Sequence, residues 1–489
     1  MSGSRTKQEV VRLDALLGVS GDAKTAISGL SADSRTVAPG YLFAALPGTR
    51  ADGSRYIPEA LARGAVAILA PRGAAFEAPT TVIEDMVPRR RFAEMAARFY
   101  GRQPALMAAV TGTNGKTSVA SFARQLWTLS GVAAASLGTL GIESPVLQRQ
   151  GGLTSPDPVT LHAALATLAA RGVGHAICEA SSHGLAQYRL DGVRFRAAAF
   201  TNLTRDHLDY HRSFEAYFHA KARLFAELLE ADAAAVINIE GDHGRRMAAL
   251  AAGYRRKLIS VGTSADAGLR LESAEARGDG QRLGIRFGDR THRVDFPLFG
   301  AFQALNALLA AGLVIACGGD PEATIRHLAR LESVPGRLER VGEGPRGGAI
   351  FIDYAHTPDG LRTILEALRP HTAGRLLVVF GCGGDRDRGK RPEMGSIAAA
   401  HADRVIVCDD NPRSEDPAAI RRDILAAAPD ASEIGDRRAA ILEAVADLGP
   451  GDTLVIAGKG HEEGQIVGDT VIPFSDLAVV REAIAGGGP

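Results

Sequence analysis

The segment Thr111-Gly112-Thr113-Asn114-Gly115-Lys116-Thr117 contains the residues whose types and spacing point most directly to chemistry. It follows an apolar run, residues 105–110, and precedes a helix-like segment, residues 118–129. A strand, a glycine turn, a Lys-Thr pair and a helix together form the arrangement that holds nucleotide phosphates. Glycines let backbone N–H groups approach the phosphates, the Lys116 ammonium can pair with the β/γ oxygens, and the Thr117 hydroxyl can bind Mg²⁺.

One position of this loop departs from the usual P-loop spacing, which places a glycine five residues before Gly115, where this chain has Val110. A Gly-Lys-Thr tripeptide without such surroundings occurs by chance in surface turns. The flanking strand and helix favour phosphate binding over a surface turn.

Two further polar clusters follow predicted strands of the same region. Glu179 comes after residues 175–178, where it could join Thr117 on Mg²⁺, the alternative being a solvated loop carboxylate. The predicted strand 197–200 leads into a segment with two histidines and two aspartates within residues 206–211. Metal ligation or substrate contact is plausible for Asp206 and His207, whereas a capped helix start explains Asp206 alone.

Lys221 lies on a predicted helix with Phe218 and Phe225 along the same face, so its side chain is expected to be partly buried. Burial lowers the pKa of a lysine. The neutral amine can then add CO₂ and become a carbamate, which is an anionic metal ligand. The alternative is that Lys221 extends its ammonium to solvent, as most helical lysines do.

Four strands are predicted near the C-terminus, at residues 350–352, 376–380, 404–408 and 453–457. A polar loop follows each of them, at residues 353–358, 381–391, 409–413 and 457–462. Residues 381–391 contain four glycines and four cationic side chains. Such a flexible, positively charged loop suits a carboxylate or a phosphate. A solvated basic turn is the alternative, and it leaves the glycine density unexplained.

Alternation of strands and helices across residues 104–335 predicts a central, mostly parallel sheet of the P-loop type with helices on both faces. In such sheets ligands bind beyond the carboxyl ends of strands, where the polar clusters fall. Within the central region, residues 262–294 are expected to form a small β excursion. Residues 1–103 predict a small α/β domain with short apolar runs at 42–46, 65–70 and 80–83, and residues 336–489 predict a doubly wound α/β domain. Three domains agree with a length of 489 residues.

Composition indicates a soluble globular protein, with 46% hydrophobic and 23% charged residues. Basic and acidic residues are equal at 56 each, so no overall field attracts nucleic acid or a membrane. The four cysteines form no C-x-x-C pair and are expected to be reduced core residues. We see no signal-peptide pattern or long apolar run, and we therefore expect a cytoplasmic protein. We also expect it to be a monomer.

Six motifs in order resemble those of the Mur ligase family, ATP-dependent enzymes that extend the peptide of bacterial cell-wall precursors. The resemblance covers essentially the whole chain, and the ordered set is far more specific than any one motif. The motifs are Thr-Gly-Thr-Asn-Gly-Lys-Thr at 111–117, Glu-Ala-Ser-Ser-His-Gly-Leu at 179–185, Asn-Leu-Thr-Arg-Asp-His-Leu-Asp-Tyr-His at 202–211, Gly-Arg-Leu-Glu at 336–339, Asp-Tyr-Ala-His-Thr-Pro at 353–358 and Asp-Asn-Pro-Arg at 410–413.

The resemblance is greatest to members that add meso-diaminopimelate to UDP-N-acetylmuramoyl-L-alanyl-D-glutamate, with ATP and Mg²⁺, in peptidoglycan precursor synthesis. It implies ATP contacts for Gly112, Thr113, Asn114, Gly115, Lys116, Thr117, Asn306 and Arg337. It implies contacts with the UDP-sugar and its dipeptide for Ser34, Thr49, Arg50, Ala51, Thr154, Ser155, Ser181, Gln187 and Arg189. Ser155 stands where the family often has threonine, which preserves the hydroxyl.

The same resemblance implies diaminopimelate contacts for Arg386, Asp410, Asn411, Pro412, Arg413, Gly458 and Glu462. Thr117 and Glu179 match ligands of one Mg²⁺, and His207 and Lys221, the latter as N6-carboxylysine, match ligands of another. The residues implied in catalysis are Lys116, Glu179, His207, Lys221 and His356. Either His356 or Glu179 could deprotonate the attacking amine.

Arg413 decides between amino-acid substrates. Diaminopimelate differs from lysine by a second carboxylate, which a guanidinium binds in a bidentate fork, whereas it would repel the ε-ammonium of lysine. Glu462 suits the distal ammonium of diaminopimelate. The alternatives are a lysine-adding ligase of the same family, a ligase like folylpolyglutamate synthetase, a P-loop kinase and a nucleotide-switched binding module. Amine-dependent ADP release separates the ligases from the last two.

Overall fold

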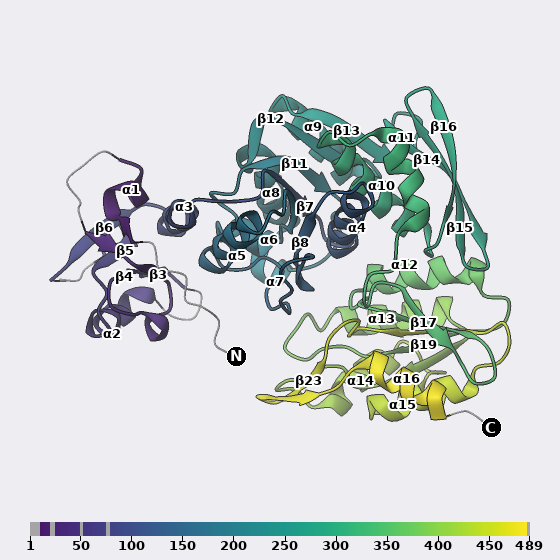
Figure 1. The fold of residues 1–489 in the computed structure, drawn as a ribbon. Helices are drawn as coiled ribbons and strands as arrows, with labels where there is room; N and C mark the ends of the chain where they lie inside the picture. Colours follow the sequence, from purple (N-terminus) through teal and green to yellow (C-terminus); the bar gives the residue numbers. More distant parts are fainter. Residues whose placement is uncertain (1–9, 20–24, 49–51, 75–78, 487–489) are drawn as a thin grey trace.

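The computed structural model describes residues 10–19, 25–48, 52–74 and 79–486. Within these residues the chain forms three α/β units, each built on its own main sheet (Figure 1). The predicted fold class is therefore confirmed, and the domain boundaries at residues 103 and 335 remain predictions. None of the described helices has the length and apolar composition needed to cross a bilayer.

The N-terminal unit is a four-stranded sheet in which all neighbours are parallel. Its strands, in spatial order, are β3 (Gly29–Ser31), β4 (Tyr41–Ala44), β5 (Ala67–Pro71) and β6 (Thr81–Asp85). A small two-stranded sheet, β1 (Val11–Arg12) and β2 (Ala26–Ile27), lies beside them, with helices α1 (Leu13–Leu17), α2 (Ile57–Ala62) and α3 (Pro88–Tyr100). The runs at 42–46, 65–70 and 80–83 predicted β4 to β6, whereas segments of two or three residues were too short to predict.

The central unit is a ten-stranded, mostly parallel sheet. Its seven consecutive parallel strands are β8 (Ala134–Gly138), β10 (His175–Glu179), β7 (Leu106–Thr111), β11 (Phe195–Phe200), β12 (Leu229–Asn238), β13 (Lys257–Gly262) and β14 (Leu269–Arg277). The antiparallel additions are β9 (Gly141–Glu143), β15 (Gly280–Phe287) and β16 (Arg290–Phe296). The predicted β excursion is thus the β14–β16 meander, while β8, β9 and β13 were missed.

Helices cover both faces of the central sheet because the strands are apolar on both sides. One face packs against α4 (Lys116–Leu129), α10 (Ala301–Ala316) and α11 (Pro321–His327). The other packs against α5 (Pro158–Ala170), α6 (Ser182–Ala186), α8 (Phe214–Arg223) and α9 (Gly241–Gly253). The short helix α7 (Leu208–His211) precedes α8.

The C-terminal unit is a six-stranded doubly wound sheet with one antiparallel edge pair. Its spatial order is β17 (Glu339–Glu343), β18 (Ala349–Asp353), β22 (Thr453–Ala457), β19 (Leu376–Phe380), β20 (Arg404–Val407) and β21 (Ser432–Glu433). Helices α12 (Pro358–Leu368), α13 (Lys390–His401) and α14 (Pro417–Leu425) pack on one face, and α15 (Arg437–Asp447) and α16 (Asp476–Gly486) on the other. A hairpin of β23 (Gly464–Val467) and β24 (Thr470–Pro473) follows β22.

The cysteines agree with the expectation of reduced core residues at three of four positions. Cys178, Cys382 and Cys408 are free and buried, whereas Cys317 is free but partly exposed, which corrects the prediction at that position. Cys317 follows the last residue of α10, where the helix ends near the surface.

Candidate active site

The P-loop forms as the sequence predicted, between the end of β7 and the start of α4. A Cβ atom at Gly112 would lie 1.8 Å from Thr201 Oγ1, and one at Gly115 would lie 2.4 Å from Asn306 Oδ1. Both glycines also have positive φ, +148° and +87°. Only glycine fits these two positions, and the loop backbone therefore turns tightly into the N-terminus of α4 without a glycine at Val110.

The end of β11 braces this loop, a role that the sequence motif did not reveal. Asn202 Oδ1 accepts from the backbone N–H of Asn114 at 3.0 Å, and Thr201 Oγ1 donates to the Asn114 carbonyl at 2.6 Å. Thr113 donates its N–H to the Asn202 carbonyl at 2.9 Å. The loop is thus preorganised by its neighbouring strand.

Thr117 and Glu179 lie together, as expected for two ligands of one ion. Thr117 Oγ1 donates to Glu179 Oε2 at 3.1 Å, and Glu179 is only 2% exposed, so it is not a solvated loop carboxylate. Thr139 donates to both Glu179 oxygens, through its N–H at 2.8 Å and its hydroxyl at 3.2 Å. Thr154 joins the same group, with its Oγ1 at 3.0 Å from that of Thr139.

Lys221 is buried, 1% exposed, on α8, as its helical position predicted. Its Nζ donates to the Gly112 carbonyl at 2.7 Å and lies 4.4 Å from the centroid of the Tyr217 ring. Burial, reinforced by the charge of Lys116, lowers the pKa of Lys221 well below its ordinary value. A neutral amine beside the P-loop is the species that can add CO₂.

Lys116 shares the Gly112 carbonyl with Lys221, since its Nζ lies 3.1 Å from that oxygen and 2.8 Å from the Thr113 carbonyl. Burial lowers the pKa of Lys116, and nearby Glu179 opposes that shift. The two amines therefore meet at one point of the loop.

These residues suit Mg²⁺, which favours few protein oxygens together with phosphates and water. The described residues contain no cluster of three or more His, Cys, Asp or Glu side chains that could hold a metal ion by themselves. Thr117 and Glu179 supply a paired hydroxyl and carboxylate. His207, in contact with Asp206 at 3.3 Å, faces the same region.

The P-loop opens into a cavity of about 380 Å³, here termed the P-loop cavity, formed by both the central and the C-terminal units. Arg337 crosses between them, because its Nη2 lies 3.1 Å from Thr117 Oγ1 and its guanidinium packs 4.5 Å from the centroid of the Tyr354 ring. The predicted nucleotide residues that line the cavity are Thr113, Asn114, Gly115, Lys116, Thr117, Asn306 and Arg337.

A second cavity of about 670 Å³, the arginine cavity, lies between the same two units. It shares Asp206, His207, Tyr354, His356 and Thr357 with the P-loop cavity, so the two spaces meet at these side chains. The predicted amino-acid contacts that line it are Arg386, Asp410, Asn411, Arg413, Gly458 and Glu462. Pro412 is not among its lining residues; its carbonyl accepts from the Glu415 N–H at 3.1 Å.

Arg386 and Arg413 are available to a substrate carboxylate. Among the described residues, neither guanidinium lies within ion-pair distance of an Asp or Glu side chain. Arg413 instead donates to the Gly384 carbonyl at 2.9 Å, and its backbone has a positive φ of 51°. Burial and the neighbouring charge of Arg386 lower the pKa of Arg413.

Lys459 is a site residue that sequence reasoning did not select. It is fully buried and does not line the arginine cavity, but its Nζ contacts two residues that do. The Nζ lies 3.0 Å from Asn411 Oδ1 and 3.2 Å from Glu462 Oε2. A surface lysine can have the same neighbouring residues in the sequence as Lys459. Its place in the Gly-Lys-Gly-His-Glu segment was therefore the one indication of its role.

The residues assigned to the dipeptide also lie together. Ser155 Oγ donates to the Glu179 carbonyl at 2.8 Å and lies 3.1 Å from Ser181 Oγ. Arg189 donates to the Ser155 carbonyl at 2.9 Å and to Gln187 Oε1 at 2.6 Å. Ser155 and Ser181 therefore connect this cluster directly to the strand end that carries Glu179.

Ser34 lies apart from these groups, in the N-terminal unit, where it is buried and donates to Glu59 Oε2 at 2.7 Å. The predicted contacts Thr49, Arg50 and Ala51 lie outside the described residues.

A phosphate-binding loop and an arginine-rich pocket meet in one cleft between two sheets, which is the arrangement expected of an ATP-dependent ligase. Three family descriptions match the chain: Mur ligase middle domain at residues 110–314, Mur ligase glutamate ligase domain at 336–460, and Mur ligase family catalytic domain at 26–100. The chain belongs to the Mur ligase family.

Its relatives include UDP-N-acetylmuramoyl-L-alanyl-D-glutamate–2,6-diaminopimelate ligase of Caulobacter vibrioides, 54% identical over 94% of this chain and 96% of that protein. The ligase of the same name from Rhizobium meliloti is 52% identical, over 95% of this chain and 96% of that protein. A solved structure with this name has a TM-score of 0.72 at 33% identity, covering 98% and 99% of the two chains. The ADP complex of MurF ligase from Thermotoga maritima, at 18% identity, 94% and 96% coverage and a TM-score of 0.62, shares the fold.

Proposed function

We propose that this chain adds meso-diaminopimelate to the D-glutamyl γ-carboxylate of UDP-N-acetylmuramoyl-L-alanyl-D-glutamate, with conversion of ATP to ADP and phosphate. The relatives that bear this activity in their names match nearly the full length of the chain. The observation that carries the proposal is the junction of the P-loop cavity with the arginine cavity. The reaction belongs to the cytoplasmic synthesis of peptidoglycan precursors.

ATP makes the condensation possible, because a carboxylate is a poor acceptor for an amine until its oxygen becomes a better leaving group. Transfer of the γ-phosphoryl group to the D-glutamyl carboxylate forms an acyl phosphate and ADP. Lys116 and the backbone N–H groups of the P-loop stabilise the charge on the transferring group. Ser155, Ser181 and Arg189 hold the dipeptide beside Glu179.

Thr117 and Glu179 would hold one Mg²⁺, and His207 with carbamylated Lys221 a second, and such ions neutralise phosphate charge and orient the transferring group. Burial of Lys221, which lowers the pKa of its amine, supports the carbamate. Lys116 completes the positive surroundings of the phosphates.

The amino acid enters the arginine cavity in a defined orientation. Arg413 and Arg386 bind the distal carboxylate, and Asp410 and Glu462 bind the distal ammonium. Lysine lacks the distal carboxylate, so it leaves both guanidiniums without a partner. This arrangement favours diaminopimelate over lysine.

His356 is the better of the two candidate bases. Both Glu179 oxygens already accept hydrogen bonds from Thr117 and Thr139. His356 borders both cavities, and its Nδ1 lies 2.9 Å from the Tyr354 carbonyl. A carbonyl can only accept, so Nδ1 carries the proton; burial lowers the pKa of His356, which leaves Nε2 as an acceptor in the neutral ring.

The test is phosphate release by the purified protein with ATP and UDP-N-acetylmuramoyl-L-alanyl-D-glutamate, with meso-diaminopimelate or L-lysine in parallel. We expect diaminopimelate-dependent phosphate release and a product enlarged by one diaminopimelate residue. Turnover that is independent of the amine would instead indicate a kinase or a nucleotide switch. Equal use of lysine would favour the lysine-adding member of the family.

A further inference from the structure

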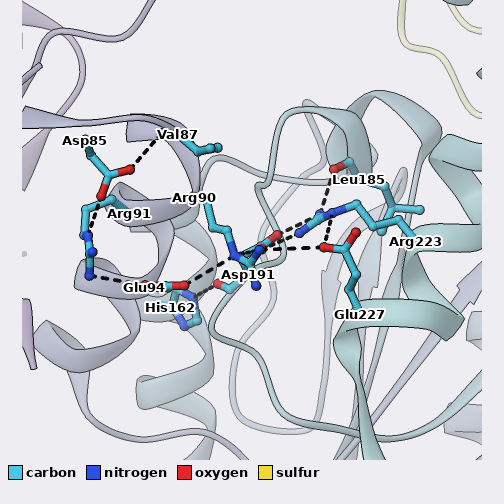
Figure 2. A network of polar contacts seen from close by, with 10 residues as sticks. All are labelled: Asp85, Val87, Arg90, Arg91, Glu94, His162, Leu185, Asp191, Arg223 and Glu227. Atoms are coloured by element: carbon cyan, nitrogen blue, oxygen red, sulfur yellow. Dashed lines mark hydrogen bonds and ion pairs between the residues drawn. The ribbon is translucent and has the colours of Figure 1, made fainter. Parts of the chain in front are cut away.

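Arg223, two residues after Lys221 on α8, belongs to a polar network (Figure 2). Its Nη1 donates to Asp191 Oδ2 and to the Leu185 carbonyl, both at 2.9 Å, and its Nη2 donates to Asp191 Oδ1. The Asp191 side chain is 3% exposed and that of Arg223 is 10% exposed. A bidentate pair this deeply buried holds both side chains in fixed directions.

The segment that Arg223 contacts is the turn containing two of the proposed dipeptide residues. The Arg223 guanidinium lies 4.3 Å from the centroid of the Tyr188 ring, and Tyr188 sits between Gln187 and Arg189. Tyr188 has a φ of +59°, a conformation that a bulky residue adopts only when its surroundings impose it. Arg223 thus contacts Leu185 just before this turn, Tyr188 within it and Asp191 just after it.

Asp191 also connects the turn to the N-terminal unit. Arg90, on α3, lies 3.5 Å from Asp191 and 3.8 Å from Glu227, and Glu227 itself pairs with Arg223 at 3.0 Å. His162 Nε2 lies 3.1 Å from the Asp191 carbonyl. Figure 2 shows Arg90 reaching from its helix toward Asp191, with Arg223 and Glu227 approaching from the other side.

We infer that Arg223 and Asp191 are positioning residues for the bound nucleotide-dipeptide. They fix the Gln187–Arg189 turn relative to the helix that carries Lys221, and Arg90 extends the connection to the N-terminal unit. This inference rests on the proposed function, since it concerns the substrate of that site. One ligand that spans the N-terminal and central units needs both of its contact regions in register, and this network is one of the links between the two units.

Loss of these contacts should weaken the binding of the nucleotide-dipeptide and not that of ATP or the amino acid. The reason is that the side chains of Arg90, Asp191 and Arg223 line neither the P-loop cavity nor the arginine cavity. Burial raises the pKa of Asp191, and its contact with Arg223 opposes that shift. Removal of the guanidinium therefore leaves a buried carboxylate without its main partner. The turn then loses the group that holds Tyr188 in its left-handed conformation.

The experiment compares Arg223→Met, Arg223→Lys, Asp191→Asn and Arg90→Gln with wild type. For Arg223→Met we expect KM for UDP-N-acetylmuramoyl-L-alanyl-D-glutamate to rise about tenfold, with KM for ATP changed less than about twofold. Arg223→Lys keeps the charge but not the fork and should recover part of this loss. Arg90→Gln, an exposed change that leaves each unit intact, should raise the same KM about threefold, and the Arg90 and Asp191 effects should be non-additive.

Arg246→Met is the matched control. Arg246 also pairs with a residue of α8, Glu215, and packs 4.1 Å from the centroid of the Phe218 ring, but it contacts no residue of the Gln187–Arg189 turn. Its loss removes an ion pair and a ring contact from the same helix, and both KM values should remain at wild-type level.

Three results would overturn the inference. These are an unchanged nucleotide-dipeptide KM in Arg223→Met and Arg90→Gln, an equal rise in Arg246→Met, or parallel loss of affinity for ATP. If Arg223→Met does not fold, Arg90→Gln and Arg223→Lys decide the matter. Calorimetric binding of the nucleotide-dipeptide to wild type separates this question from the proposed function: a wild type that binds it without ligating diaminopimelate contradicts only the latter.

Discussion

The Nζ atom of Lys459 lies 3.0 Å from Oδ1 of Asn411, and both side chains are buried, Asn411 in the wall of the arginine cavity and Lys459 behind it. The same ammonium lies 3.2 Å from Glu462 and 3.8 Å from Asp410. Asn411 also donates through Nδ2 to Glu462 Oε2 at 3.1 Å. One cation against two carboxylates leaves a single net negative charge, which matches one substrate ammonium.

Replacement of Lys459 by methionine should therefore raise KM for diaminopimelate by about tenfold, because Glu462 and Asn411 lose their common partner and two carboxylates remain close together. KM for ATP should stay within about twofold of wild type. Lys459→Arg, which retains the charge, should give an intermediate value. Steady-state kinetics with each substrate varied checks this, and a uniform fall in kcat alone would argue for a general structural defect.

Loss of Arg413 should affect the choice of amine more than the use of ATP. Truncation of a guanidinium that binds a carboxylate in a buried site costs about 2–5 kcal/mol, or roughly 30- to 4,000-fold in kcat/KM. We expect Arg413→Ala to lose this factor for diaminopimelate, with little change for lysine. Arg388→Ala is the control, because Arg388 belongs to the basic loop 381–391, which also lines the arginine cavity, but is 73% exposed and pairs with Glu415. Equal losses for both amines would contradict the assignment of Arg413.

The extent to which the fold could be predicted depended on the apolar and β-branched character of its strands. The strands around residues 376–380 and 453–457 were predicted at their observed bounds, because both are short apolar runs between glycine-rich or charged loops. The pair β8 and β9 was missed because residues 134–143 are small and glycine-rich, with little β-branched character. The edge of the central sheet therefore had to come from the structure.

The candidate site divided in a similar way. Lys116, Thr117 and Glu179 could be selected because each follows a strand, and parallel strands bring their carboxyl ends together. Arg337 and Lys459 act across a unit boundary or from behind a cavity wall, as their contacts with Thr117 and Glu462 show. The family resemblance supplied Arg337, but no local pattern distinguishes Lys459 from a surface lysine. Contacts of this kind cannot be inferred from the spacing of residues in the sequence.

Carbamylation of Lys221 should make activity depend on dissolved CO₂. Because burial lowers the pKa of this amine, more of it is neutral and able to add CO₂ at a given pH than for an exposed lysine, and acidification protonates it and removes the carbamate. We expect Lys221→Ala to be nearly inactive and to regain some activity with added short-chain carboxylic acids. Incorporation of isotopically labelled bicarbonate, observed by carbon NMR, checks the modification. Full activity of Lys221→Ala without any added acid would exclude it.

Asp353 should give the C-terminal unit a pH-dependent stability of a specific sign. Burial raises the pKa of this carboxyl group to about 6, although its oxygens accept from the Leu338 and Ala355 N–H groups, each at 2.6 Å. The folded state therefore binds the proton more tightly than the unfolded state. The resulting stabilisation is complete below the unfolded pKa, near 4, and is lost as pH rises to about 6, by at most about 1.4 kcal/mol per pH unit.

Asp353→Asn leaves one N–H without an acceptor and should be less stable throughout, but it should lack this decline. Urea unfolding of both proteins at about pH 4.5 and about pH 6.5 tests the difference, since wild type must lose more stability than the variant between the two conditions. An equal change in both proteins would show that Asp353 is already ionised across the whole range.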